Sequence, residues 1–438
     1  MNTKFLFVAA SIISLFSSCT PKFTVPAPAS GSADFSNYLA VGNSLTAGYA
    51  DGSLYASGQN NSYPHMLAKQ FEMVGGTTDF KIPYLVDDAG WPGVKYVLGY
   101  GTDCSGTTSL GPINFAGSVN SANGTNISSQ GPFNNWGIPG IRLIDYKTVG
   151  YGSAFGNPYA ARMFSNPLHT TLQEVDAVPH TFFSCWLGSN DVLGYATNGG
   201  EGAASGTGFT DISPIANFTA MYDTVIRHLT SSGAKGVCIN IPDVTAIPYF
   251  TTIPYNGLTL DASTAQALNV GFAGTGLSFA EGANPFVIAD PSTTTGFRQI
   301  KSDEYILLTI PLDSVRCAGW GTLVPIPKKY VLDESEVSNI KTATAAFNSV
   351  IQQTADKFGL AYVDVNTYFT TFKSGMIYNG VHYSTQFVTG GLFSLDGVHP
   401  NPRGYAMVAN LIIRTINSKF GSTLPEIDAN AYPGVVFP

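Results

Sequence analysis

The sequence predicts an α/β fold in which a parallel sheet is flanked by helices on both faces, giving three layers with loop-rich insertions. Two observations predict it. Short, continuous apolar runs recur along the chain, as expected for strands that are buried on both faces. Segments with apolar residues at helical spacing lie between these runs, and alternation of strands with crossovers of this length favours parallel pairing.

Four apolar runs are predicted to be the strands of the sheet. They are rich in Val, Ile, Ala and aromatic residues, most of which favour a buried, pleated surface. Their positions are 38–41 (YLAV), 181–187 (TFFSCWL), 236–241 (GVCINI) and 361–365 (AYVDV).

Three longer helices are predicted between and after these strands. The first carries apolar residues at helical spacing over 215–229 and is stopped by Gly233. The second begins with a capping-box pattern at Asp333 and Glu336 and ends at Gly359. The last helix opens at Asn401-Pro402 and stops at Gly421.

Two stretches break this alternation. Residues 99–131 are rich in Gly, Ser, Thr and Asn, and residues 243–332 are rich in aromatic residues and Pro, with one strand-like piece at 305–310. We interpret both as insertions into one domain that spans 34–421, followed by a C-terminal tail at 422–438.

Composition and charge exclude several classes of protein. Charged residues make up 11% of the 438 residues and aromatic residues 12%, which argues against a disordered chain and against a coiled coil. The net charge is −8, and Lys and Arg form no visible basic patch. Because affinity for nucleic acid depends on clustered Lys and Arg, we expect no nucleic-acid partner.

The N-terminus has the features of a processing signal. Lys4 precedes the apolar run 5–16, which is too short to span a bilayer but has the length of a secretory signal's apolar region. The run ends in Leu15-Phe16-Ser17-Ser18-Cys19, which resembles the lipobox of bacterial lipoproteins. We therefore expect a signal peptide at 1–18, lipid on Cys19 that anchors the chain in a membrane, and a Pro/Ser-rich tether at 19–33. This predicts a lipoprotein of the bacterial cell envelope, on the periplasmic or surface face of the outer membrane.

Four further cysteines fall into two groups. Cys185 and Cys238 lie in predicted buried strands, so we expect free thiols there. Cys104 and Cys317 lie in loop-rich stretches, where an exported protein could form a disulfide, but four cysteines allow three pairings and the sequence leaves this open.

Polar residues that could take part in catalysis follow the predicted strands. Ser44 comes directly after the first strand and Asn190 directly after the second, in Gly188-Ser189-Asn190-Asp191. The carboxyl ends of parallel strands are where open α/β sheets place their sites. Asp396 and His399 are three residues apart in DGVHP, so one tight turn can place the carboxylate beside the imidazole and leave its other nitrogen free as a base.

The glycine-rich segment 135–140 (NWGIPG) is predicted to be a loop with accessible backbone N–H groups. Other histidines have no acidic partner in a turn comparable to DGVHP, and we expect them to be structural: His65, His169, His180, His228 and His382.

Together these segments resemble the GDSL/SGNH hydrolase superfamily of GDSL-like lipases and acylhydrolases. Ser44 lies in a GDS-like segment, Gly140 in an N-x-G-x-x-G segment, Asn190 in GSND, and Asp396 with His399 in DGVHP. The resemblance implies a flavodoxin-like fold. It also implies that Ser44, Asp396 and His399 are catalytic, and that an oxyanion hole is formed by Ser44, Gly140 and Asn190, with no metal or cofactor.

One position departs from the family pattern, because Asn43 stands where the family usually has Asp. Asn can also accept a hydrogen bond at that turn, so the departure does not remove the resemblance.

The resemblance implies a serine esterase or acylhydrolase that cleaves carboxylic esters, with an acyl lipid or an acylated carbohydrate as substrate. Two alternatives stay open: a carbohydrate acetyl esterase, and a catalytically inactive, glycan-binding surface lipoprotein. Four aromatic residues of the second insertion could floor an acyl pocket, stack on sugars or pack as core: Tyr249, Phe250, Tyr255 and Trp320.

Overall fold

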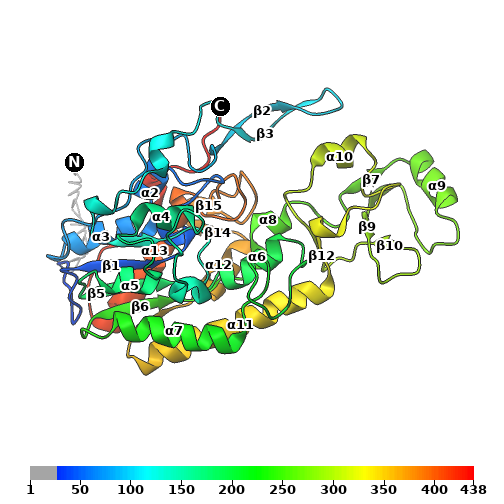
Figure 1. Cartoon of the computed structure of the whole chain (residues 1–438). Helices are drawn as coiled ribbons and strands as arrows, with labels where there is room; N and C mark the ends of the chain where they lie inside the picture. The colour runs from blue at the N-terminus through cyan, green and yellow to red at the C-terminus, as the bar shows by residue number, and fades with distance from the viewer. Residues whose placement is uncertain (1–26) are drawn as a thin grey trace, which may run out of the picture.

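Five parallel strands form a sheet in the order β13–β6–β5–β1–β4, with helices on both faces (Figure 1). The computed structural model describes residues 27–438. It confirms the predicted α/β fold with a flanked parallel sheet. The predicted signal peptide, Cys19 and the first part of the tether lie outside the described residues.

The four predicted strands are consecutive neighbours in this sheet, from the edge strand β13 to β1. They are β1 (Tyr38–Gly42), β5 (Phe182–Trp186), β6 (Lys235–Ile239) and β13 (Ala361–Val363). The fifth strand, β4 (Asn135–Gly137), corrects the prediction of a loop at 135–140. Its three residues carry no strand-like apolar pattern, and pairing of Ala40 with Asn135 in register at the edge of β1 gives them their strand geometry.

Two helices cover each face of the sheet. On one face α7 (Ile215–Leu229) packs against α11 (Glu334–Lys357), and on the other α3 (Tyr63–Glu72) packs against α13 (Pro402–Phe420) (Figure 1). The predicted helix signals are confirmed. Asp333 and Glu336 form a capping box, Asn401 caps α13, and Gly421 ends α13 in the left-handed conformation.

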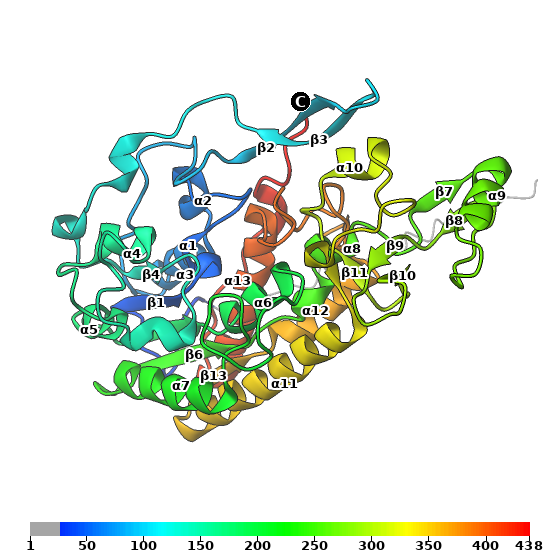
Figure 2. The same ribbon diagram turned by 45° about the vertical axis from the view of Figure 1, so that its right-hand side comes forward.

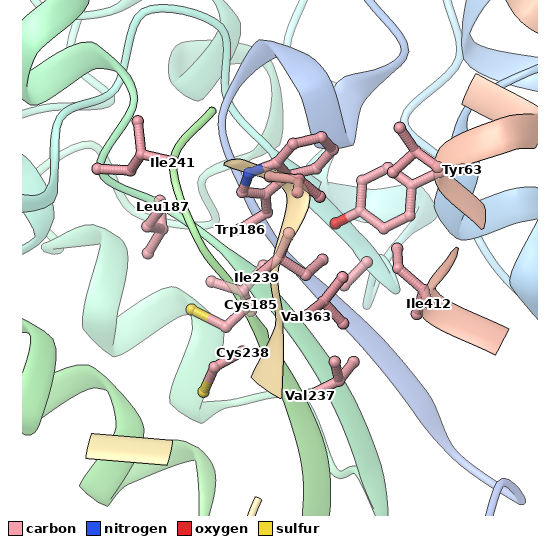
Figure 3. Close-up of a cluster of buried hydrophobic side chains, with 14 of the residues drawn as sticks. Tyr63, Cys185, Trp186, Leu187, Val237, Cys238, Ile239, Ile241, Val363 and Ile412 are labelled. Atoms are coloured by element: carbon pink, nitrogen blue, oxygen red, sulfur yellow. The ribbon is translucent and has the colours of Figure 1, made fainter. Parts of the chain in front are cut away.

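Side chains of the central strands alternate between these two layers, as the two-residue period of a strand requires (Figure 3). Trp186 points to the α3 side, where its ring lies 5.4 Å from that of Tyr63. Cys185 and Cys238 lie together on the opposite side, next to Tyr222 of α7. Both thiols are free and buried, as predicted.

The first interrupted stretch contains an antiparallel hairpin of β2 (Tyr96–Thr102) and β3 (Thr108–Asn114), with its tip at 103–107. The second stretch carries its own small apolar clusters and projects from the sheet domain (Figure 1). Its elements are α8 (Pro248–Thr251), β7 (Leu258–Leu260), α9 (Ala262–Gly271), β8 (Gly282–Asn284), β9 (Val287–Ala289), β10 (Phe297–Gln299), β11 (Tyr305–Ile306), α10 (Leu312–Cys317) and β12 (Val331–Leu332).

A disulfide joins these two stretches. Cys104 at the hairpin tip and Cys317 at the end of α10 are bonded, with their Cα atoms 6.4 Å apart, although 213 residues separate them in the sequence. The tip of the hairpin and α10 lie side by side in both views of the chain (Figures 1 and 2). The pairing that the sequence left open is therefore Cys104 with Cys317.

The shorter elements that connect this framework are α1 (Ser44–Ala47), α2 (Ala56–Asn60), α4 (Pro158–Met163), α5 (Thr171–Asp176), α6 (Asn190–Thr197), α12 (Val365–Lys373), β14 (Met376–Tyr378) and β15 (Val381–Tyr383). Across residues 27–438, none of the helices combines the length and the apolar character needed to cross a bilayer.

Gly137 allows β4 to approach α1 closely, and we predict that Gly137→Ala destabilises the fold. A Cβ at this position would collide with the backbone of Thr46 and Ala47. Because backbone cannot move aside as a side-chain tip can, we expect a loss of about 2 kcal/mol or more in the free energy of unfolding, measured by urea denaturation. Gly93→Ala is the control, since a Cβ there meets no described atom within 4 Å. Equal stability of the two variants would contradict the close approach.

Candidate active site

Ser44 lies at the carboxyl end of β1, as the first residue of α1. Asn43 caps this helix, with its Oδ1 accepting a hydrogen bond from the Leu45 N–H at 3.0 Å. The side-chain oxygen of Asn43 thus caps the helix, although the family usually has Asp at this position. Its buried Nδ2 has no hydrogen-bond partner among the described residues.

The chain brings Ser44 and His399 together although 355 residues separate them. Ser44 Oγ lies 2.9 Å from His399 Nε2, and His399 Nδ1 lies 2.9 Å from Asp396 Oδ2. The turn that carries Asp396 and His399 leads directly into α13, whose N-cap is Asn401. Packing of α13 on the sheet therefore holds this turn against the end of β1.

The Asp396 carboxylate is held by the backbone of its own turn and by a distant loop. Oδ1 accepts hydrogen bonds from the N–H groups of Val398 and His399 at 2.8 and 2.9 Å, and from the Ser394 hydroxyl at 2.9 Å. Oδ2 accepts one from the Gly52 N–H at 3.0 Å. With so many donors around it, the carboxylate has a fixed orientation toward the imidazole.

These donors also keep Asp396 ionised. Burial alone would raise the pKa of its carboxyl, but the adjacent His399 and the hydrogen bonds outweigh burial and lower the pKa to about 2. An ionised Asp396 accepts the Nδ1–H of the neutral imidazole. This fixes the tautomer in which Nε2 presents its lone pair to the Ser44 hydroxyl.

A loop that the sequence analysis missed supports this turn. The Asp51 N–H donates to the Ser394 hydroxyl at 2.9 Å, and Asp51 Oδ1 accepts from the Leu395 N–H at 2.9 Å. The Tyr49 ring lies against the His399 ring, with 4.7 Å between centroids. The dipeptide Asp51-Gly52 signals a turn in the sequence, but nothing local indicates which distant segment the turn binds.

Asn190 and Gly140 are placed near each other at the same edge of the sheet. Asn190 is the first residue of α6, and its Nδ2 donates to the carbonyl of Ile141 at 2.9 Å. One of the two amide N–H bonds is used in this way, which leaves the other available. Gly140 directly precedes Ile141, is exposed and has φ +81°. The same loop is tied to the end of β1, because the Ile138 N–H donates to the carbonyl of Gly42 at 3.1 Å.

Asp191 is a second supporting residue that the sequence analysis did not assign. Its buried carboxylate accepts hydrogen bonds from the Leu143 N–H at 2.8 Å and from the Ser213 hydroxyl at 2.7 Å. Burial raises the pKa of Asp191 to about 6. Since Leu143 lies two residues beyond Ile141, Asp191 fixes the loop to which Asn190 is bonded.

Two cavities of different size meet at His399. The smaller one, of about 40 Å³, is lined by Ser44, Asn190 and His399 together with apolar side chains. The larger one, a cleft of about 880 Å³, lies between the β2–β3 hairpin and α10 and reaches Asp396 and His399.

The four aromatic residues of the second insertion have different places. Tyr249 lines the large cleft. Phe250 is fully buried, and Tyr255 and Trp320 pack on the insertion's own apolar cluster. Core packing therefore accounts for three of the four.

Two histidines that were expected to be structural also contact carboxylates. His169 lies 2.8 Å from Glu174, and His228 lies 2.7 Å from Asp176. Neither histidine lines the cavity that contains Ser44, among the described residues. A histidine–carboxylate pair alone thus does not mark the site, whereas the contact of His399 with Ser44 does.

The solved structures to which the chain is similar include two hydrolases. An extracellular lipase from Streptomyces rimosus aligns with 86% of this chain and 98% of its own, at 14% identity and a TM-score of 0.34. A single-site variant of Axe2, an acetyl-xylooligosaccharide esterase from a Geobacillus, aligns with 88% of this chain and 96% of its own, at 11% identity and a TM-score of 0.35.

A search of curated proteins finds no match. The family model for GDSL-like lipase/acylhydrolase matches residues 38–412, a range that begins with β1 and ends within α13. It includes Ser44, Gly140, Asn190, Asp396 and His399. The chain is a hydrolase of ester bonds and belongs to the GDSL-like lipase/acylhydrolase family.

Proposed function

We propose that the protein is a serine esterase in which Ser44 is the nucleophile, His399 the general base and acid, and Asp396 the residue that orients His399. The observation that carries the proposal is the continuous hydrogen-bonded chain from Ser44 Oγ through His399 to Asp396, with both contacts at 2.9 Å. A serine hydroxyl is a weak nucleophile by itself and needs such a base within hydrogen-bond reach.

Each step of the proposed reaction uses atoms that this arrangement supplies. Ser44 Oγ attacks the ester carbonyl carbon while His399 Nε2 takes its proton. Collapse of the tetrahedral intermediate breaks the bond to the alcohol oxygen, which receives that proton and leaves. Water then attacks the acyl–Ser44 ester with His399 again as base, and the acid product and free Ser44 result.

We assign the oxyanion hole to the backbone N–H groups of Ser44 and Gly140 and to the Asn190 side chain. The support is local. Asn190 lines the same small cavity as Ser44, and the remaining N–H of its amide is available to a developing oxyanion. Donors that are already fixed before the reaction stabilise the transition state without reorganisation.

The inactive, glycan-binding alternative is less well supported than an enzyme. The Asp396 carboxylate is held by four donors and the Nε2 atom of His399 is left facing Ser44. A protein that only binds has no need of this orientation. Acylated carbohydrates, which are themselves esters, are one class of substrate within the proposed activity.

We further propose that the enzyme is anchored in the bacterial envelope through lipid on Cys19. The support is the apolar run 5–16 that ends in Ser17-Ser18-Cys19. The Pro/Ser-rich tether that follows would hold the domain at a distance from the lipid surface.

Replacement of the nucleophile gives the first test. We expect Ser44→Ala to lower kcat/KM on 4-nitrophenyl acetate by a factor on the order of 10³ or more, with thermal unfolding nearly unchanged. Ser62→Ala is a matched control, because Ser62 is also buried and its hydroxyl has no hydrogen-bond partner in the described part of the chain. Hydrolysis at the wild-type rate by Ser44→Ala would reject the proposal.

We expect acid to lower the activity of the enzyme at a higher pH than the one that unfolds the chain. Only a neutral imidazole can accept the Ser44 proton, so kcat/KM should fall as the medium becomes acidic. The pKa of Asp396 is lower in the folded chain than its ordinary 3.8. Its carboxylate therefore stabilises the fold above about pH 4, and this contribution of roughly 2 kcal/mol is lost only as the pH falls toward 2.

The measurement pairs activity with urea denaturation between pH 8 and pH 3. We expect the activity lost in acid to return at pH 7.5, and to be lost while urea denaturation still shows a folded chain. If activity and folded structure disappear over the same pH interval, unfolding rather than loss of the base is the cause.

Anchoring is tested by Cys19→Ser expressed in a bacterial host with lipoprotein processing. We expect the wild type in the membrane fraction after a carbonate wash and the variant in the soluble fraction, with equal kcat/KM. A variant that stays with the membranes would show that another feature anchors the chain.

A further inference from the structure

An ester substrate has an acyl part and an alcohol part, and two cavities meet at His399. The assignment of one part to each cavity rests on the proposed function. We infer that the enzyme cleaves esters of a short acyl group with a bulky, amphipathic alcohol. The acyl group occupies the small pocket beside Ser44, and the alcohol part is held in the cleft that the Cys104–Cys317 disulfide spans.

The side of each part follows from the reaction itself. The acyl carbon is bonded to Ser44 in the intermediate, and its oxygen points to Asn190; both residues line the small pocket and neither lines the cleft. The alcohol oxygen leaves with the proton from His399, which lines both cavities. The alcohol therefore departs on the side of His399 that faces the cleft.

The size of the small pocket limits the acyl group. It has a volume of about 40 Å³ and apolar walls that include Leu193, Val244 and Phe369. The same measure gives about 880 Å³ for the cleft, so the pocket is much the smaller of the two spaces. A two-carbon acetyl group suits it better than the eight-carbon chain of an octanoyl group.

The cleft has space for a much larger group. Its volume of about 880 Å³ lies near the upper end of the range for sites that bind drug-sized molecules. One wall is the β2–β3 hairpin with Leu110 and Ile113, and the other is the segment that leads into α10, with Ile310 and Leu312.

The disulfide fixes the distance between these walls. A hairpin of two strands has little stability of its own in water. Here its tip is bonded through Cys104 to Cys317, and Arg316 pairs with Asp103 at 2.8 Å. The hairpin is thereby held as a wall of the cleft.

The lining indicates an alcohol with both apolar and polar surfaces. Aliphatic side chains of both walls and the rings of Tyr96, Tyr249 and Phe387 provide apolar contact. Hydroxyl groups of Thr102 and Ser109 and the charged pair of Asp103 with Arg316 lie along the same cleft. An acylated oligosaccharide and a large hydroxylated ring compound both have this chemistry.

The first experiment uses the wild-type enzyme and two series of esters. The acyl series is 4-nitrophenyl acetate, butyrate and octanoate. We expect kcat/KM to fall by about 100-fold or more from acetate to octanoate, because the chain exceeds the pocket. The alcohol series compares ethyl acetate with an acetylated disaccharide and with the acetate of a steroid alcohol. We expect at least one of the two bulky acetates to exceed ethyl acetate by about 10-fold or more, and the better one identifies the source of the alcohol.

Variants of each cavity give the second experiment. Gly111→Trp adds a ring at a position that lines the cleft, where a Cβ meets no described atom within 4 Å. The ratio of kcat/KM for the bulky acetate to that for ethyl acetate should fall about 10-fold. Gly271→Trp on α9 is the matched control and should keep the wild-type ratio, since Gly271 is equally unobstructed and lies outside both linings.

Two further variants keep the test independent of Gly111. The double variant Cys104→Ser/Cys317→Ser should lower the same ratio, by raising KM for the bulky ester. Leu193→Ala widens the small pocket and should reduce the preference for acetate over butyrate.

A preference for octanoate that Gly111→Trp removes would overturn the inference, because the cleft would then hold the acyl chain. A preference for ethyl acetate over both bulky acetates would also overturn it. In either case loss of activity in Ser44→Ala would leave the serine esterase intact, so the two failures are distinguishable.

Discussion

The site depends on one long-range contact, the docking of the turn at 394–399 onto the loop at 51–52. Asp51 exchanges hydrogen bonds with Ser394 and Leu395, and the Gly52 N–H donates to Asp396. These contacts join the segment just after α1 to the segment just before α13. Without these contacts the Asp396 carboxylate would lose a fixed donor, and His399 would no longer be held within hydrogen-bond distance of Ser44. Two elements at opposite ends of the chain thus act as one unit at the edge of the sheet.

The sequence predicted the parts of this unit that have local signatures. Buried strands, helix caps at Asp333 and Asn401, and the segments around Ser44, Asn190 and His399 are each visible within a few residues. The partners of those segments are not. Nothing near Asp51 indicates Leu395, which is 344 residues away. The edge strand β4 was missed for a related reason, since its three residues become a strand only by pairing with β1.

The two insertions also come together from distant parts of the sequence, and they do so beside the site. Neither resembles a regular α/β element in the sequence, and the three possible cysteine pairings left their relation open. In the folded chain the hairpin and α10 are bonded to each other and lie on opposite sides of a cleft that ends at His399. In the proposed mechanism the sheet and its helices position the reacting side chains, while the two insertions form the cleft proposed to hold the alcohol part of the substrate.

We propose above that Ser44 is the nucleophile because His399 and Asp396 activate it. The most direct measurement is to react the intact enzyme with a fluorophosphonate and to map the modified peptide by mass spectrometry. We expect a single adduct on Ser44 that forms much more slowly in His399→Ala. An active enzyme that is modified at another residue, or labelling of Ser44 that does not depend on His399, would contradict it.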